Sequence, residues 1–281
     1  MSESLDVNRT AKLFIGGKFP RSESARSFEV HDQEGNFLAN ASLASRKDGR
    51  DAVVAARSAF SAWSSATAYN RGQVMYRVAE IMQGRRDQFI AEVSAWSSIE
   101  EAAIEVDAAI NRWVWYAGWT DKLSMVTGSN NPVAEPFFNF SIPEPTGVVA
   151  GFALSDSPLL GLVEMIAAAI VSGNTVVVVA SDRTPLPAVS LAEVIATSDV
   201  PGGVVNILTG YAKEIAPWLA SHMDVNGIDL SGIGDSELAV ELERSSAQNL
   251  KRVLRPNTHL DGLSRVKMWL ETKTVWHPRG Y

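Results

Sequence analysis

The stretch from Gly147 to Gly210 constrains the fold of this 281-residue chain more than any other part of the sequence. It contains three short apolar runs, at residues 148–153, 175–180 and 204–208, and two segments of helical length separate them. Strands that are apolar on both faces are typical of a parallel sheet covered by helices on both sides. Alternating strands and helices with short connections predict an α/β fold, a doubly wound Rossmann-like domain.

Three local signals predict where the helices of this stretch begin and end. Ser157 followed by Pro158 is typical of a helix N-cap and first turn, and Thr184 followed by Pro185 repeats the arrangement. Gly173 stands where the first of these helices must end, at a left-handed position that favours glycine.

The remaining apolar spacing predicts further helices before and after this stretch. Helical periodicity covers residues 48–62, 70–86, 87–98, 99–123 and 236–254. Glu100, Glu101 and Glu105 form an acidic cluster in the fourth of these helices, which we expect to be a solvated face.

Composition excludes several classes of function. The formal net charge of −7, with no compensating Lys/Arg stripe, argues against a nucleic-acid surface. No apolar run reaches the roughly 20 residues that a membrane span needs, and the polar opening residues do not resemble a signal segment. We therefore expect a cytoplasmic protein with no membrane partner.

The chain contains no cysteine, which fits a reducing compartment. It follows that the chain itself supplies no thiol nucleophile, no disulfide and no thiolate metal ligand. The four histidines show no metal-ligand spacing, so we predict no metal site.

Two stretches are predicted to be edge strands. In residues 130–145, Phe138, Phe140 and Ile142 alternate with polar residues, and the prolines of this stretch belong on an edge rather than in the centre of a sheet. In residues 265–277, Met268 and Leu270 lie on one face of the second predicted strand. Exposed edges with apolar faces need to be covered.

Several motifs resemble the aldehyde dehydrogenase superfamily, in the same order along nearly the whole chain. They are Phe14-Ile15-Gly16-Gly17-Lys18, Ala117-Gly118-Trp119-Thr120-Asp121-Lys122, Gly173-Asn174-Thr175-Val176-Val177, Thr184-Pro185-Leu186, Val200-Pro201-Gly202-Gly203-Val204-Val205-Asn206, Thr209-Gly210, Asn249-Leu250-Lys251-Arg252-Val253 and Glu271-Thr272-Lys273-Thr274-Val275-Trp276.

This resemblance implies a division of the chain. Residues 1–129 and 146–260 would form the cofactor-type, NAD-binding-like domain, and residues 130–145 and 264–281 the oligomerisation strands. The family's catalytic domain of about two hundred residues would be absent, because only residues 254–263 lie between the Leu-Lys-Arg-Val motif and the closing strand. The implied oligomerisation residues are Phe138, Phe140, Ile142, Met268, Leu270, Thr274 and Trp276.

The resemblance also implies that the family's chemistry is lost. Family members attack the aldehyde with a cysteine thiolate and pass hydride to NAD(P), a route closed to a chain without cysteine. Pro256 stands at the register of the general-base glutamate, and Asp156 at that of the oxyanion-stabilising asparagine, where its charge has the wrong sign. We therefore predict no catalytic residue.

The same resemblance implies that several residues that contact the cofactor in the family are replaced in this chain. Val179 replaces the lysine that holds the adenosine ribose, Asp182 stands where a glutamate is common, and Ile233 replaces a phosphate-contacting serine. Gly232 and Gly234, before a predicted helix, are the remaining cofactor candidates through their backbone N–H groups, although an ordinary strand-to-helix turn has the same pattern. We expect no resident cofactor, with weakened NAD(P) binding as the alternative.

Two functions follow. The first is a catalytically inactive subunit that assembles with a full-length aldehyde dehydrogenase, which it stabilises or regulates, or with a second copy of itself, through the edge strands. The second is an NAD(P)-binding oxidoreductase component that is active only within a complex.

Overall fold

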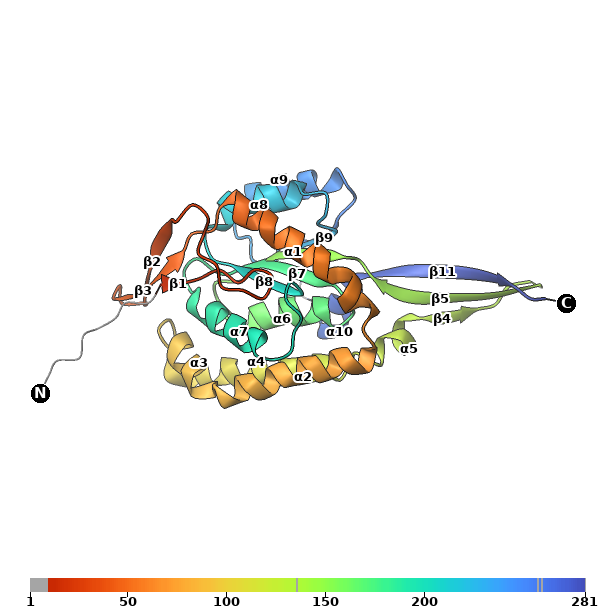
Figure 1. The fold of residues 1–281 in the computed structure, drawn as a ribbon, viewed down its shortest axis with the longest axis horizontal. Coiled ribbons are helices and arrows are strands. Elements are labelled where there is room, and N and C mark those ends of the chain that lie inside the picture. The colour runs from red at the N-terminus through yellow and green to blue at the C-terminus, as the bar shows by residue number, and fades with distance from the viewer. Residues whose placement is uncertain (1–9, 135, 257, 259, 281) are drawn as a thin grey trace, which may run out of the picture.

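The computed structural model describes residues 10–134, 136–256, 258 and 260–280. These residues form a body around a parallel sheet and a long three-stranded arm that projects from one end of the body (Figure 1). The described part of the N-terminal region lies at the opposite end of the body from the arm.

The body is organised around a five-stranded sheet in which every neighbouring pair of strands is parallel. The strand order β10-β9-β6-β7-β8 starts in the middle, at β6, and winds outwards in both directions. This arrangement confirms the predicted doubly wound α/β fold. The strands are β6 (Val148–Phe152), β7 (Thr175–Val179), β8 (Val205–Leu208), β9 (Gly227–Asp229) and β10 (Arg252–Leu254).

Helices cover both faces of this sheet (Figure 1). One face packs against α1 (Arg46–Ser65), α8 (Ala212–Ser221) and α9 (Ser236–Ala247). The other face packs against α6 (Leu160–Ile170) and α7 (Leu186–Ala196), and beyond them lie α2 (Ala68–Gly84), α3 (Arg86–Val93) and α4 (Ile99–Ala117).

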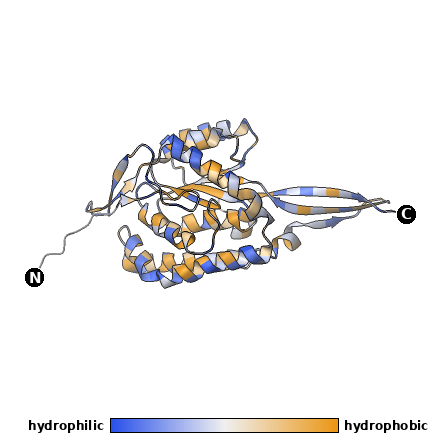
Figure 2. Ribbon diagram, in the orientation of Figure 1, coloured by the Kyte–Doolittle hydropathy of each residue, from blue (hydrophilic) through white to orange (hydrophobic). Residues whose placement is uncertain are grey.

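Burial on both faces explains the apolar composition of the strands. Val148 and Ala150 belong to the core cluster on the α1 side, while Val149 between them belongs to the cluster on the α6 side. The strands of the arm differ from those of the body. Figure 2 shows hydrophobic strands inside the body and alternating hydrophilic and hydrophobic residues along the arm.

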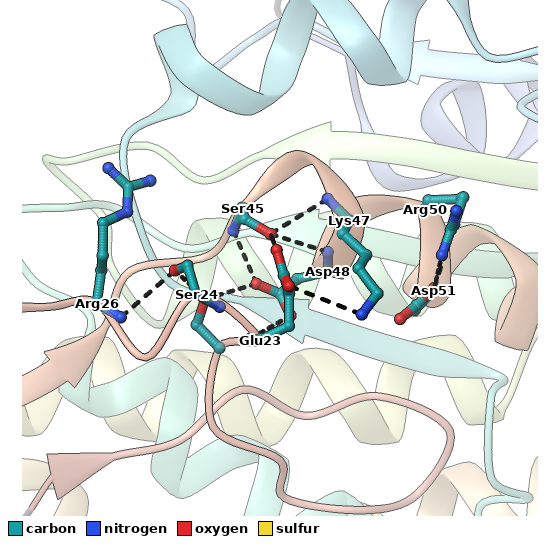
Figure 3. Close-up of polar contacts among 9 residues, drawn as sticks. Glu23, Ser24, Arg26, Ser45, Lys47, Asp48, Arg50 and Asp51 are labelled. Atoms are coloured by element: carbon teal, nitrogen blue, oxygen red, sulfur yellow. Dashed lines mark hydrogen bonds and ion pairs between the residues drawn. The ribbon is translucent and has the colours of Figure 1, made fainter.

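A small sheet with the order β1-β3-β2 precedes the body; its strands are β1 (Thr10–Ala11), β2 (Ser27–His31) and β3 (Phe37–Ser42). The start of α1 is tied to the loop before β2 by the buried carboxylate of Asp48 (Figure 3). Asp48 accepts hydrogen bonds from Ser22 Oγ at 2.7 Å, from Glu23 N at 3.1 Å and from Ser45 N at 2.8 Å. The side chain of Ser45 caps α1 in return, which completes a capping box.

The arm consists of three antiparallel strands in the order β11-β5-β4. They are β4 (Ser129–Asn131), β5 (Phe137–Pro145) and β11 (Leu270–Pro278), with the short helices α5 (Leu123–Thr127) and α10 (Gly262–Met268) leading into β4 and β11. β5 and β11 pair over nine residues, from Leu270 opposite Pro145 to Pro278 opposite Phe137.

The helix boundaries around β7 differ in part from the prediction. Gly173 has a φ of +102°, so its predicted left-handed position is confirmed. α6 begins at Leu160 and α7 at Leu186, and neither has a side-chain cap from its own N-cap residue. The predicted capping role of Ser157 is confirmed in part, because its hydroxyl accepts a hydrogen bond from Gly161 N at 3.0 Å. The predicted cap at Thr184 is wrong. Thr184 Oγ1 is buried and makes no hydrogen bond with the described residues.

Several predicted elements have different bounds. The helix predicted to reach residue 98 ends at Val93. The helix predicted to reach residue 123 ends at Ala117, and the helix predicted to reach residue 254 ends at Ala247. A turn with Leu250 at a φ of +58° then leads into β10. The strand predicted from residue 265 is helical up to Met268, because Asp261 caps α10 and the burial of Val266 and Trp269 follows helical spacing.

Candidate functional site

One crevice of the body lies at the carboxyl ends of the parallel strands, where doubly wound sheets bind their ligands. Its volume is about 330 Å³. The ends of β6 and β7, the first turn of α8 and the turn before α9 form its walls. Its lining residues include Ser155, Val179, Asp182, Lys213, Gly232 and Asp235.

The two candidate glycines, Gly232 and Gly234, both line this crevice, but their surroundings differ. A Cβ atom on Gly232 would lie 2.1 Å from the carbonyl oxygen of Phe152 and 2.7 Å from that of Ala153. Around Gly234, no atom lies within 4 Å of such a Cβ position. The close approach of two backbone segments is therefore sufficient to explain Gly232 without a phosphate.

The N-terminus of α9, where a phosphate would be held, carries a carboxylate of this chain instead. Asp235 Oδ1 accepts hydrogen bonds from Glu237 N at 2.9 Å and from Leu238 N at 3.2 Å. Ile233 N donates to the carbonyl oxygen of Leu230 at 2.9 Å, and the Ile233 side chain is buried. These three N–H groups are thus already used, and a phosphate would have to compete with the negative charge of Asp235.

The other side chains of the crevice carry charges of both signs. The carboxylate of Asp182 and the ammonium group of Lys213 are exposed, while Val179 is buried in the wall. Lys213 was not predicted, because it lies outside the motifs that resemble the family.

A smaller cavity, of about 180 Å³, lies beside this crevice and shares Ser155 with it. Asp156 and Arg183 line it, and so does Glu105 from α4. Glu105 Oε1 accepts hydrogen bonds from Leu159 N and Leu160 N, both at 3.0 Å, so it caps α6 from another helix. The prediction of a solvated acidic face is therefore wrong for Glu105.

Replacing Glu105 by alanine is expected to lower the free energy of unfolding by about 1–2 kcal/mol, because it removes the cap of α6 and leaves N–H groups unpaired. Urea denaturation measures the change. The matched control is Glu100→Ala on the exposed side of the same helix, which should stay within about 0.5 kcal/mol of the unmodified chain. Equal effects of the two substitutions would contradict this role of Glu105.

The arm places the predicted oligomerisation residues on different surfaces. Phe138, Phe140 and Ile142 share one face of β5, and Phe138 and Ile142 are 38% and 37% exposed. Trp276 lies opposite Asn139, and so on the other face, where it is 59% exposed.

The polar face of β5 is the more buried one. Asn139 accepts a hydrogen bond from Asn131, and the hydroxyl of Ser141 lies 2.9 Å from that of Thr274. Met268 lies in α10 rather than in a strand, and Leu270 at the base of the arm belongs to the body's core cluster. Fewer of the predicted residues are therefore exposed on the arm than the sequence suggests.

One buried ion pair was missed. Asp229 in β9 is fully buried, and its Oδ2 lies 2.7 Å from Nη1 of Arg265 in α10. The hydroxyl of Ser231 donates to the other carboxylate oxygen at 2.6 Å. A single charged residue between the apolar residues Ile228 and Leu230 was the available signal, but the sequence did not indicate its partner.

The described residues contain neither a metal-binding cluster nor a membrane-spanning helix. In residues 10–134, 136–256, 258 and 260–280, no group of three or more His, Cys, Asp or Glu residues is placed to hold a metal ion. Within the same residues, no helix combines the length and the apolar character needed to cross a membrane.

Comparison with known proteins gives consistent matches. The sequence model of the aldehyde dehydrogenase family matches residues 19–255. The chain is 32% identical over 258 residues to retinal dehydrogenase 2 of Gallus gallus, covering 89% of this chain and 49% of that protein. It is also 32% identical over 262 residues to cytosolic 10-formyltetrahydrofolate dehydrogenase of Homo sapiens, covering 88% of this chain and 28% of that protein.

A solved structure supports the same relationship. The NAD+ complex of an aldehyde dehydrogenase from Bacillus cereus superposes with a TM-score of 0.81 at 26% identity, over 87% of this chain and 50% of that chain. The chain thus spans about half the length of this structure and of the avian relative, and less of the human one.

Proposed function

The chain belongs to the aldehyde dehydrogenase family, and we propose that it is a subunit without catalysis of its own, which assembles with a full-length aldehyde dehydrogenase in the cytoplasm and stabilises or regulates it. The observation that carries the proposal is the contrast between an intact arm and an altered crevice. The arm keeps nine paired residues between β5 and β11, whereas the crevice and its surroundings lack the groups that the reaction needs.

The absence of a nucleophile supports the first half of the proposal. The chain has no cysteine, and the position of the general base is taken by Pro256. Asp156, at the oxyanion position, lines the smaller cavity, where it would repel the negative charge that develops in the transition state.

The residues of the crevice favour the proposal that this chain binds a dinucleotide only weakly. Asp235 occupies the N–H groups at the start of α9, and Val179 offers no charge or hydrogen bond to a ribose. The residues present do not fit the pyrophosphate, so we assign no hydride transfer to this chain.

The alternative, an NAD(P)-binding component that is active only in a complex, has one observation in its favour, the open crevice with Lys213 and Asp182. Calorimetry with NAD and NADP separates the two functions. We expect no binding tighter than about 100 μM, which corresponds to about −5.5 kcal/mol. We also expect no NADH formation from a panel of aldehydes with the purified chain alone; tight binding or turnover would favour the alternative.

The arm supports the second half of the proposal, and its apolar face gives the test. We expect the double variant Phe138→Ser/Ile142→Ser to recover at least about tenfold less full-length aldehyde dehydrogenase subunit in a pull-down from the native host, because both side chains are exposed on one face of β5. The mass of the intact complex, measured by mass spectrometry, identifies the partner and its ratio.

The control for this experiment is Leu250→Ser, which removes an apolar side chain that is 89% exposed on the body. It should recover as much partner as the unmodified chain. Recovery of no dehydrogenase subunit by the unmodified chain would overturn the proposal, and an equal loss with the control would show that the arm is not the contact.

A further inference from the structure

The smaller cavity lies where two strands of the central sheet end. Asp156 follows β6, Arg183 and Thr184 follow β7, and Glu105 lines the cavity from α4. Its volume of about 180 Å³ equals that of about six water molecules in the liquid. The cavity therefore has room for a small organic molecule but not for a dinucleotide.

Two side chains of opposite charge line the cavity and are exposed to solvent, those of Asp156 and Arg183. Neither makes an ion pair or a side-chain hydrogen bond with any residue in 10–134, 136–256, 258 and 260–280. By contrast, Arg85, Arg86 and Arg112 each lie 2.6–2.7 Å from a carboxylate. Both charges at the cavity are therefore available to a ligand.

Two further polar groups at the cavity have no partner in the described part of the chain. Thr184 is 4% exposed, and its hydroxyl makes no hydrogen bond there. Glu105 Oε1 accepts hydrogen bonds from Ser157 Oγ, Leu159 N and Leu160 N, but its Oε2 accepts none. Buried hydroxyl groups in folded proteins nearly always have a partner. A ligand that forms a hydrogen bond with Thr184 would account for this exception.

One part of the cavity wall is apolar. Val93 and Pro158 are buried there, and the ring of Trp96 lines the cavity as well. The indole N–H of Trp96 donates to the carbonyl oxygen of His31 at 2.9 Å, which leaves the carbon atoms of the ring for the cavity. This part of the wall suits a methyl group or another small apolar side chain.

The mixed charges select the class of ligand. A simple anion would be attracted by Arg183 but repelled by the carboxylates of Asp156 and Glu105, and a simple cation would meet the reverse. A small zwitterion satisfies both signs at once, because charged hydrogen bonds form to its carboxylate and to its ammonium group. An α-amino acid carries both charges and a side chain on one carbon atom, which agrees with the size of the cavity.

We propose that the smaller cavity binds a small apolar α-amino acid such as alanine. Arg183 and the hydroxyl of Thr184 hold its carboxylate, Asp156 and Oε2 of Glu105 hold its ammonium group, and its side chain packs against Trp96. This inference goes beyond the proposed function and does not depend on it. Binding is measured on the purified chain alone, so its failure would leave the assembly with a dehydrogenase subunit untouched.

Three matched probes test the class of ligand in calorimetry with the purified chain. Alanine carries both charges, propionate lacks the ammonium group, and ethylamine lacks the carboxylate. We expect alanine to bind with a dissociation constant below about 10 mM, and at least about tenfold more tightly than either of the other two. No saturable binding of alanine up to this concentration, or equal binding of propionate or ethylamine, would overturn the proposal.

Two charge-neutralising variants test the position of the ligand. Arg183→Gln and Asp156→Asn should each weaken the binding of alanine at least about tenfold, and both side chains are exposed, so the fold should persist. The matched control is Arg50→Gln, on α1 at the opposite face of the sheet, which should bind alanine as the unmodified chain does. Unchanged affinity in both cavity variants would place the ligand elsewhere and contradict the proposal.

Thr184→Val separates a ligand contact from a structural role. It removes the unpartnered hydroxyl and keeps the shape of the side chain, so the melting temperature of the chain without alanine should not fall. The affinity for alanine should fall at least about fivefold, because one hydrogen bond to the carboxylate is lost. A lower melting temperature with unchanged affinity would show that the hydroxyl supports the fold instead, and this assignment would be wrong.

Discussion

Replacing Arg265 by leucine is expected to lower the free energy of unfolding by about 3–5 kcal/mol, because it leaves the buried carboxylate of Asp229 without its partner. The carboxylate is fully buried and the Arg265 side chain is 12% exposed, so water cannot replace the lost charge. Ser231 supplies a hydrogen bond but no positive charge. Chemical denaturation followed by circular dichroism measures the change.

Two variants identify the cause of this loss. Arg255→Leu removes an arginine whose pair with Glu243 is on the surface, at 69% and 36% exposure, and it should cost no more than about 1 kcal/mol. Adding Asp229→Ala to Arg265→Leu removes the stranded charge and should restore most of the stability. If the double variant is as unstable as the single one, the effect comes from lost packing of α10 and the electrostatic explanation is wrong.

The second large effect is expected at Gly232, where alanine should lower the free energy of unfolding by about 1–3 kcal/mol or more. The added Cβ would lie 2.1 Å from the Phe152 carbonyl oxygen. Because the obstacle is the backbone of the central strand, no rotation of a side chain relieves it. The melting temperature of the purified chain is the simplest measurement.

Gly234→Ala is the matched control, since nothing lies within 4 Å of its added Cβ. It should change the stability by less than about 1 kcal/mol. A tolerated alanine at Gly232 would mean that strand packing does not require this glycine, and the explanation by ligand contact would then regain support.

Much of the fold could be predicted because its determinants are local. The apolar runs at β6, β7 and β8 are continuous in sequence, and strands buried on both faces leave little choice but a parallel sheet covered by helices. Gly173 was correctly placed because only a left-handed turn at the end of α6 satisfies both the helix and the strand that follows.

The errors occurred where distant parts of the chain decide the local structure. The start of α6 was misplaced because Glu105, in another helix, provides its cap. Met268 was predicted in a strand because a short run of alternating apolar residues fits both periodicities, and its helix is fixed by Asp261 and by the contact of Arg265 with the sheet. Neither Glu105, which caps α6, nor Asp229, which pairs with Arg265, can be identified from the residues next to these helices.

The contacts in the crevice could likewise not be predicted from neighbouring residues alone. Gly232 and Gly234 both line it, but their motif does not show that Asp235 already holds the helix start. The position of Lys213 depends on the packing of α8 beside the sheet, which the sequence pattern does not reveal.

The position of β11 in the sequence has a consequence for biosynthesis. β5 is made before the central sheet, but its partner β11 leaves the ribosome only after every strand of the body. The body can therefore fold while β5 is paired only with the short strand β4, and the arm is completed last. Any contact of β11 with another subunit would form only after translation of the body is complete, so folding of the body would precede association.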